Sequence, residues 1–172
     1  LDGSSAASDV YKRQHLGWRA VGIADRFSCG GLVRAHMAIK DIAAQNNPDQ
    51  KPVSSLSLDK LICGVGVSLH DGGDILCYAR TVDGYHSLCQ WLSAEMMRSG
   101  HDNRALPDMY ISDLGRLSSD VIVITLPPVL ANTDYREQAR TISLFAPSDV
   151  YVGGYLMRDG CDEERLYRLS QE

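Results

Sequence analysis

AVGIADRFSCGGLVR, residues 20–34, is the stretch that decides the fold of this chain. Its first five residues are small or apolar, with β-branched side chains at alternate positions, and they are too few for a helix. They therefore predict a buried strand of the parallel kind. Asp25 follows where this strand ends, and Gly30 and Gly31 allow a sharp turn into a helix that we expect over residues 32–44.

Asp25 is the first candidate for a functional residue. In α/β folds, ligands bind at the carboxyl ends of the strands, so an acid at this position is a candidate metal ligand or catalytic group. Aspartate at the same position also serves as a cap, accepting backbone N–H bonds from the turn and the following helix. Because Asp is among the usual capping residues, spacing alone favours the cap, and both roles stay open.

Strands and helices are predicted to alternate along the rest of the chain. Residues 70–73, HDGG, separate two apolar runs and indicate a hairpin. The predicted strands lie at 61–69, 74–79, 120–125 and 149–156, and the predicted helices at 83–98, 110–117, 133–144 and from 162 onward. This alternation favours a largely parallel α/β sheet or barrel, and the pattern alone does not separate a barrel from a doubly wound sheet.

Composition and charge exclude several classes of protein. The chain has 172 residues, 44% hydrophobic and 23% charged, which is ordinary for a globular domain. No apolar run approaches the ~20 residues that span a bilayer, so we expect a cytoplasmic protein without a membrane partner. The net charge of −5 and the scattered arginines argue against a domain that wraps duplex DNA by itself. The five cysteines form no CxxC pair and are interpreted as reduced core residues.

Residues 1–14, LDGSSAASDVYKRQ, differ from the rest of the chain. They are small and polar, and they show neither helical nor strand periodicity. We interpret them as a non-native or disordered leader and exclude them from the fold. The domain proper is then expected over residues 15–172.

Four segments together resemble a known family. They are the stretch Ile-Ala-Asp-Arg with its glycine turn and Leu-Val-Arg-Ala-His helix start, then LICGVGVSL at 61–69, DILCYARTVDGYHSLCQWL at 74–92 and VIVITLPP at 121–128, with the closing residues 151–169. Their order and spacing resemble the polymerase and histidinol phosphatase (PHP) domain of the error-prone form of the bacterial DNA polymerase III alpha subunit. The resemblance implies an incomplete, distorted (β/α) barrel that lacks its first strand and its C-terminal part.

The same resemblance identifies positions that hold metal in other members of the family. Asp25 is kept, but Arg26 stands where those members have His, and a guanidinium cannot ligate a cation. Gly66 stands where they have Glu, and Asp74 where they have His. We therefore interpret Asp25, Arg26, Gly66 and Asp74 as a degenerate metal site, with Asp25 and Asp74 as weak candidate ligands. No catalytic residue, metal or other cofactor is predicted for this stretch, and Arg26 is expected to pair with Asp25 or with Asp74.

Other catalytic motifs are absent from the sequence, which has no GxSxG, GxxxxGK[ST], GxGxxG or HExxH. The resemblance implies a parent nucleotidyltransferase that needs magnesium and copies DNA during translesion synthesis and repair. This segment would have a structural role against the polymerase body, with replication or translesion proteins as further partners and with DNA reached through the parent. Two alternatives remain: a PHP metal-dependent phosphoesterase and a non-catalytic α/β binding module.

Overall fold

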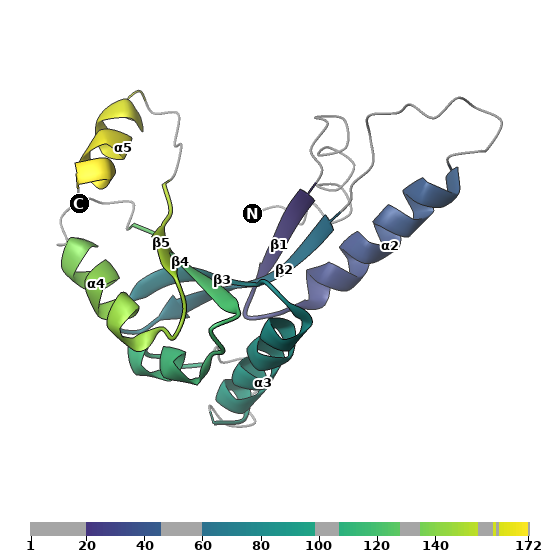
Figure 1. Ribbon diagram of the computed structural model, residues 1–172, viewed down its shortest axis with the longest axis horizontal. Coiled ribbons are helices and arrows are strands. Elements are labelled where there is room, and N and C mark those ends of the chain that lie inside the picture. The colour runs from purple at the N-terminus through teal and green to yellow at the C-terminus, as the bar shows by residue number, and fades with distance from the viewer. Residues whose placement is uncertain are drawn as a thin grey trace. The chain divides into compact units, whose positions relative to one another are not determined.

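The computed structural model describes residues 20–45, 60–98, 107–127, 135–154, 160 and 162–171. The predicted leader at 1–14, together with His15, His101 and Cys161, lies outside these residues. The elements, in chain order, are β1 (Ala20–Arg26), α2 (Gly30–Gln45), β2 (Lys60–Leu69), β3 (Gly73–Ala79), α3 (Val82–Arg98), η1 (Ile111–Arg116), β4 (Val121–Thr125), α4 (Tyr135–Phe145), β5 (Val150–Val152) and α5 (Asp162–Gln171) (Figure 1). No helix among the described residues is long and apolar enough to cross a membrane.

The chain forms two compact units, Leu1–Val65 and Gly66–Glu172, and β2 runs from the first into the second. In the first unit, α2 lies alongside β1 (Figure 1). Val21 and Ile23 of β1 are buried, and their side chains pack against residues one helical turn apart on α2. The cluster consists of Val21, Ile23, Ala35 and Ala38. The strand and helix predicted from residues 20–34 are therefore confirmed.

The strands follow one another in the order β1-β2-β3-β4-β5. β3 pairs with β4 in the antiparallel sense, with Cys77 opposite Val123, and β4 pairs with β5 in the parallel sense, with Val123 opposite Val150. The prediction of a largely parallel sheet is wrong for β3. Residues 70–72 close the predicted hairpin, and so short a connection reverses the direction of the chain.

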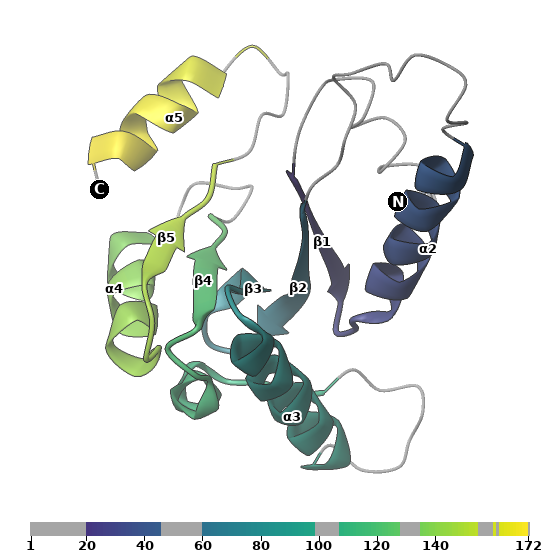
Figure 2. The same ribbon diagram turned by 45° about the vertical axis from the view of Figure 1, so that its right-hand side comes forward.

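The core of the second unit lies against one face of this sheet. Val121, Val123 and Thr125 of β4 are buried, whereas the alternate residues Ile122 and Ile124 are half-buried. The Tyr135 hydroxyl of α4 donates to Thr125 Oγ1 at 3.2 Å, so α4 covers the buried face of β4. Figure 2 shows α4 beside β4 and β5.

A buried ion cluster joins α3 to η1. Glu95 of α3 is fully buried, and it accepts hydrogen bonds from Arg98 Nε at 2.7 Å and from Arg116 Nη1 at 2.6 Å. Arg98 also contacts Asp113 Oδ2 at 3.1 Å, and the Trp91 indole donates to the Asp113 carbonyl at 2.9 Å. These bonds explain why residues 111–116 form a short 3-10 helix against α3.

Candidate functional site

Asp25 lies next to last in β1, at the carboxyl end of the strand as predicted. Its Oδ2 atom accepts a hydrogen bond from the Gly31 backbone N–H at 2.6 Å. Gly31 is in the first turn of α2, where backbone N–H groups have no partner within the helix. The half-buried Asp25 carboxylate therefore caps α2, which is one of the two roles left open by the sequence.

In the turn between β1 and α2, the residue with a left-handed backbone is not one of the two glycines that the sequence suggested. The residue with a left-handed backbone is Phe27, with φ of 52°, and its side chain is buried. Gly31 is required because of a close approach, since a Cβ atom there would lie 2.4 Å from Asp25 Oδ2. The glycine was predicted correctly, but it makes room for the cap and is not the left-handed residue of the turn.

Arg26 ends β1 with an exposed side chain. Its guanidinium carbon lies 5.8 Å from the centroid of the Phe27 ring, in the range of a cation–π contact. The expected pairing with Asp25 or with Asp74 stays a prediction.

Asp74 and Gly66 belong to the second unit, whereas Asp25 and Arg26 belong to the first. Asp74 is the second residue of β3, and its Oδ1 accepts a hydrogen bond from Ser68 Oγ at 2.5 Å. Its backbone carbonyl accepts from Leu126 N–H at 2.9 Å, just beyond the end of β4. Asp74 therefore lies at the edge of the sheet where β2 and β4 end, which is the edge expected for a site. Gly66 lies within β2 and offers no side-chain ligand.

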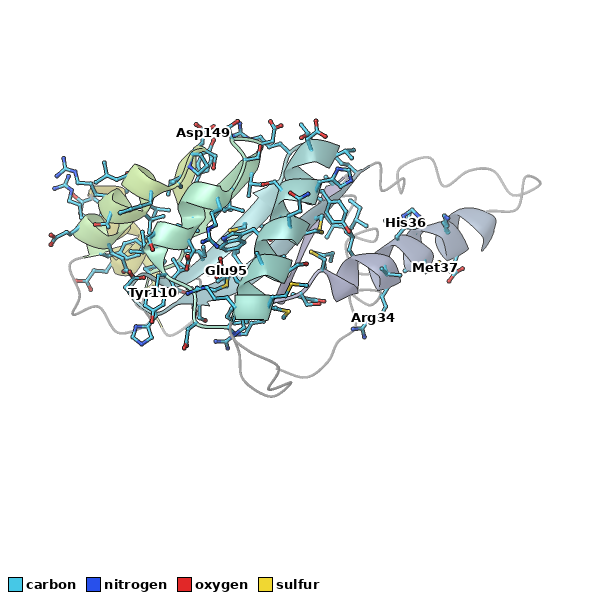
Figure 3. The ribbon with its side chains drawn as sticks, turned by 90° about the horizontal axis from the view of Figure 1, so that it is seen from below. Arg34, His36, Met37, Glu95, Tyr110 and Asp149 are labelled. Atoms are coloured by element: carbon cyan, nitrogen blue, oxygen red, sulfur yellow. The ribbon has the colours of Figure 1, made fainter. Side chains whose placement is uncertain are left out.

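The histidines on described residues have surroundings that suit structural roles. His70 packs its ring 5.3 Å from that of Tyr110, and its backbone N–H donates to the Met109 carbonyl at 2.8 Å. His36 projects from α2 beside Arg34 and Met37, and all three are exposed (Figure 3). Within the described ranges, no group of three or more His, Cys, Asp or Glu side chains is arranged to hold a metal ion.

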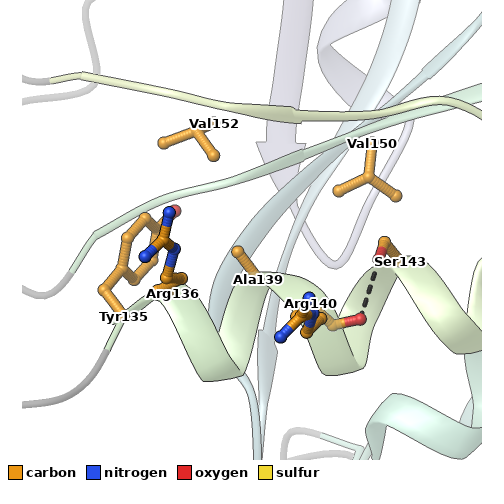
Figure 4. Close-up of a pocket in the computed structure, with 7 residues that line it drawn as sticks. All are labelled: Tyr135, Arg136, Ala139, Arg140, Ser143, Val150 and Val152. Atoms are coloured by element: carbon orange, nitrogen blue, oxygen red, sulfur yellow. Dashed lines mark hydrogen bonds between the residues drawn. The ribbon is translucent and has the colours of Figure 1, made fainter. Parts of the chain in front are cut away.

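A pocket that sequence reasoning did not predict lies between α4 and β5 (Figure 4). Its volume is about 540 Å³, and its lining residues are Tyr135, Arg136, Ala139, Arg140, Ser143, Val150 and Val152. The sequence feature that could have indicated this pocket is the pair Arg136 and Arg140. They lie one turn apart on the helix predicted over 133–144, which gives that helix a positively charged face.

Comparison with known sequences connects this chain to one kind of enzyme, although no family model matches it. It is 27% identical over 168 residues to the error-prone DNA polymerase of Pseudomonas aeruginosa, covering 97% of this chain and 14% of the relative. It is 28% identical over 180 residues to the error-prone DNA polymerase of Rhodopseudomonas palustris, with 99% and 14% covered. The corresponding enzyme of Brucella abortus is 26% identical over 173 residues, with 99% and 15% covered.

Comparison of structures gives a consistent result for the fold. A protein from Bifidobacterium adolescentis assigned as a metal-dependent phosphoesterase matches with a TM-score of 0.57 and 12% identity, over 97% of this chain and 78% of that protein. The sequence comparisons confirm the resemblance to error-prone DNA polymerases that the motifs indicated. The chain is thus similar in sequence to error-prone DNA polymerases, and it spans about 14% of the length of the curated relatives it matches.

Proposed function

We propose that this chain is the PHP-type portion of an error-prone DNA polymerase III alpha-like protein and that its role in that parent is structural. The parent would be a cytoplasmic, magnesium-dependent nucleotidyltransferase that performs translesion synthesis. Residues 15–172 would form an incomplete, distorted (β/α) barrel that packs against the polymerase body. DNA and the replication or translesion proteins would be bound by the parent as a whole. The polymerase relatives and the phosphoesterase-like fold support this proposal.

The observation that carries the structural role is the contact of Asp25. This residue matches a metal position of the family, yet its Oδ2 atom receives the Gly31 N–H at 2.6 Å and caps α2. A metal ion at Asp25 would have to share a carboxylate that already accepts this hydrogen bond. Two of the other matched positions do not fit a metal cluster, because Arg26 carries a fixed positive charge and Gly66 has no side-chain ligand atom. Asp74 alone would add a second carboxylate, and two carboxylates are few for a hydrolytic metal cluster.

The structural similarity to a metal-dependent phosphoesterase favours the alternative that this chain is itself a phosphoesterase. Measuring metal binding distinguishes this alternative from the structural role. We expect calorimetric titration of the 172-residue chain with Mn²⁺ or Zn²⁺ to give weak binding or none, and an aryl phosphodiester substrate to show no turnover. The matched control for Asp25→Ala is Asp41→Ala, which removes an exposed acid from α2. Sub-micromolar metal binding that disappears in Asp25→Ala but persists in Asp41→Ala would establish the phosphoesterase reading instead.

A further inference from the structure

We draw no further inference here: the strongest candidate, the outer face of α2 with the exposed apolar side chains of Val33 and Met37, carries no proposal because nothing in the structure shows what covers that face.

Discussion

At the level of single residues, Asp25 and Gly31 form one contact that joins a strand to a helix. The Asp25 carboxylate lies at the end of β1, and it accepts a hydrogen bond at 2.6 Å from the first turn of α2. The bond is possible only because Gly31 has no side chain. The two residues therefore depend on each other.

Gly31→Ala should destabilise the chain. The added Cβ would meet Asp25 Oδ2 at 2.4 Å, so the cap must break or the helix must shift, at a cost of about 1–3 kcal/mol. Gly30→Ala is the matched control, because its Cβ would meet only Ser28 Oγ, at 3.1 Å. Urea denaturation monitored by circular dichroism measures both. Equal stability of the two variants would mean that the Asp25 contact does not hold the helix.

Because the Cys77 thiol is buried, we expect the stability of the chain to depend on pH. Burial raises the pKa of its thiol to about 12, whereas the thiol in the unfolded chain keeps its ordinary pKa of about 8.5 to 9. Above that lower value the unfolded chain loses a proton that the folded chain keeps. This contribution to stability is therefore fully present below pH 9 and is lost as the pH rises toward 12.

Cys77→Val removes this titration while keeping a buried apolar side chain of similar size. We expect the free energy of unfolding of the unaltered chain to fall more steeply between pH 9 and 11 than that of the variant, by at most about 1.4 kcal/mol per pH unit. Urea titrations at successive pH values give the comparison. Parallel profiles would show that Cys77 ionises in the folded state as easily as in the unfolded one.

At the level of elements, the Glu95 cluster makes the joint between α3 and η1. The Glu95 side chain is fully buried, but Arg98 and Arg116 are 46% and 58% exposed. The buried carboxylate has lost its hydration and depends on the arginines to balance its negative charge. The arginines remain partly hydrated, so they tolerate removal of the carboxylate better. Sequence periodicity did not predict this cluster, because a glutamate within a helix is ordinarily assigned to the solvent face.

Removing the arginines should thus cost more than removing the acid. The double variant Arg98→Ala/Arg116→Ala removes two cations from a buried carboxylate and should lose about 3–5 kcal/mol of stability. Glu95→Leu fills the same space with an apolar side chain and should cost clearly less. Thermal and urea unfolding of both variants test this order, with Arg34→Ala as the exposed control. The reverse order would mean that the cluster is not desolvated in solution.

At the level of the whole molecule, charge separates this chain from a DNA-binding domain. It has 17 basic and 22 acidic residues, for a net charge of −5. Affinity for duplex DNA comes mainly from neutralising phosphates, and three of the described arginines, Arg80, Arg98 and Arg116, form ion pairs with acids of the chain. Any role in DNA synthesis would then depend on other parts of a longer protein.

The purified chain should therefore leave the mobility of a short DNA duplex unchanged at physiological salt. An electrophoretic mobility shift assay over a range of protein concentrations measures this directly. A shift that weakens steeply with added salt would contradict the expectation, because that slope reports released counterions and hence phosphate contacts. The Arg136→Glu/Arg140→Glu variant would then show whether the two arginines beside the pocket between α4 and β5 bind the DNA.

The sequence by itself determined which segments are strands and which are helices. Short apolar runs with β-branched residues predicted β1 and β4, and the three- and four-residue spacing predicted α2 and α3. It also placed Asp25 at the end of its strand and a required glycine beside it. These features could be predicted because each depends on neighbours within a few residues along the chain.

Tertiary structure alone decided the antiparallel pairing of β3 with β4, the burial of Glu95 and the length of β5. β5 spans only Val150–Val152, although the sequence predicted a strand over 149–156, because its length is set by pairing with β4. Periodicity reports that a side chain is buried, but not which strand lies beside it or in which direction that strand runs. Pairing, ion clusters and grooves join residues that are far apart in the chain, so only the folded backbone determines them.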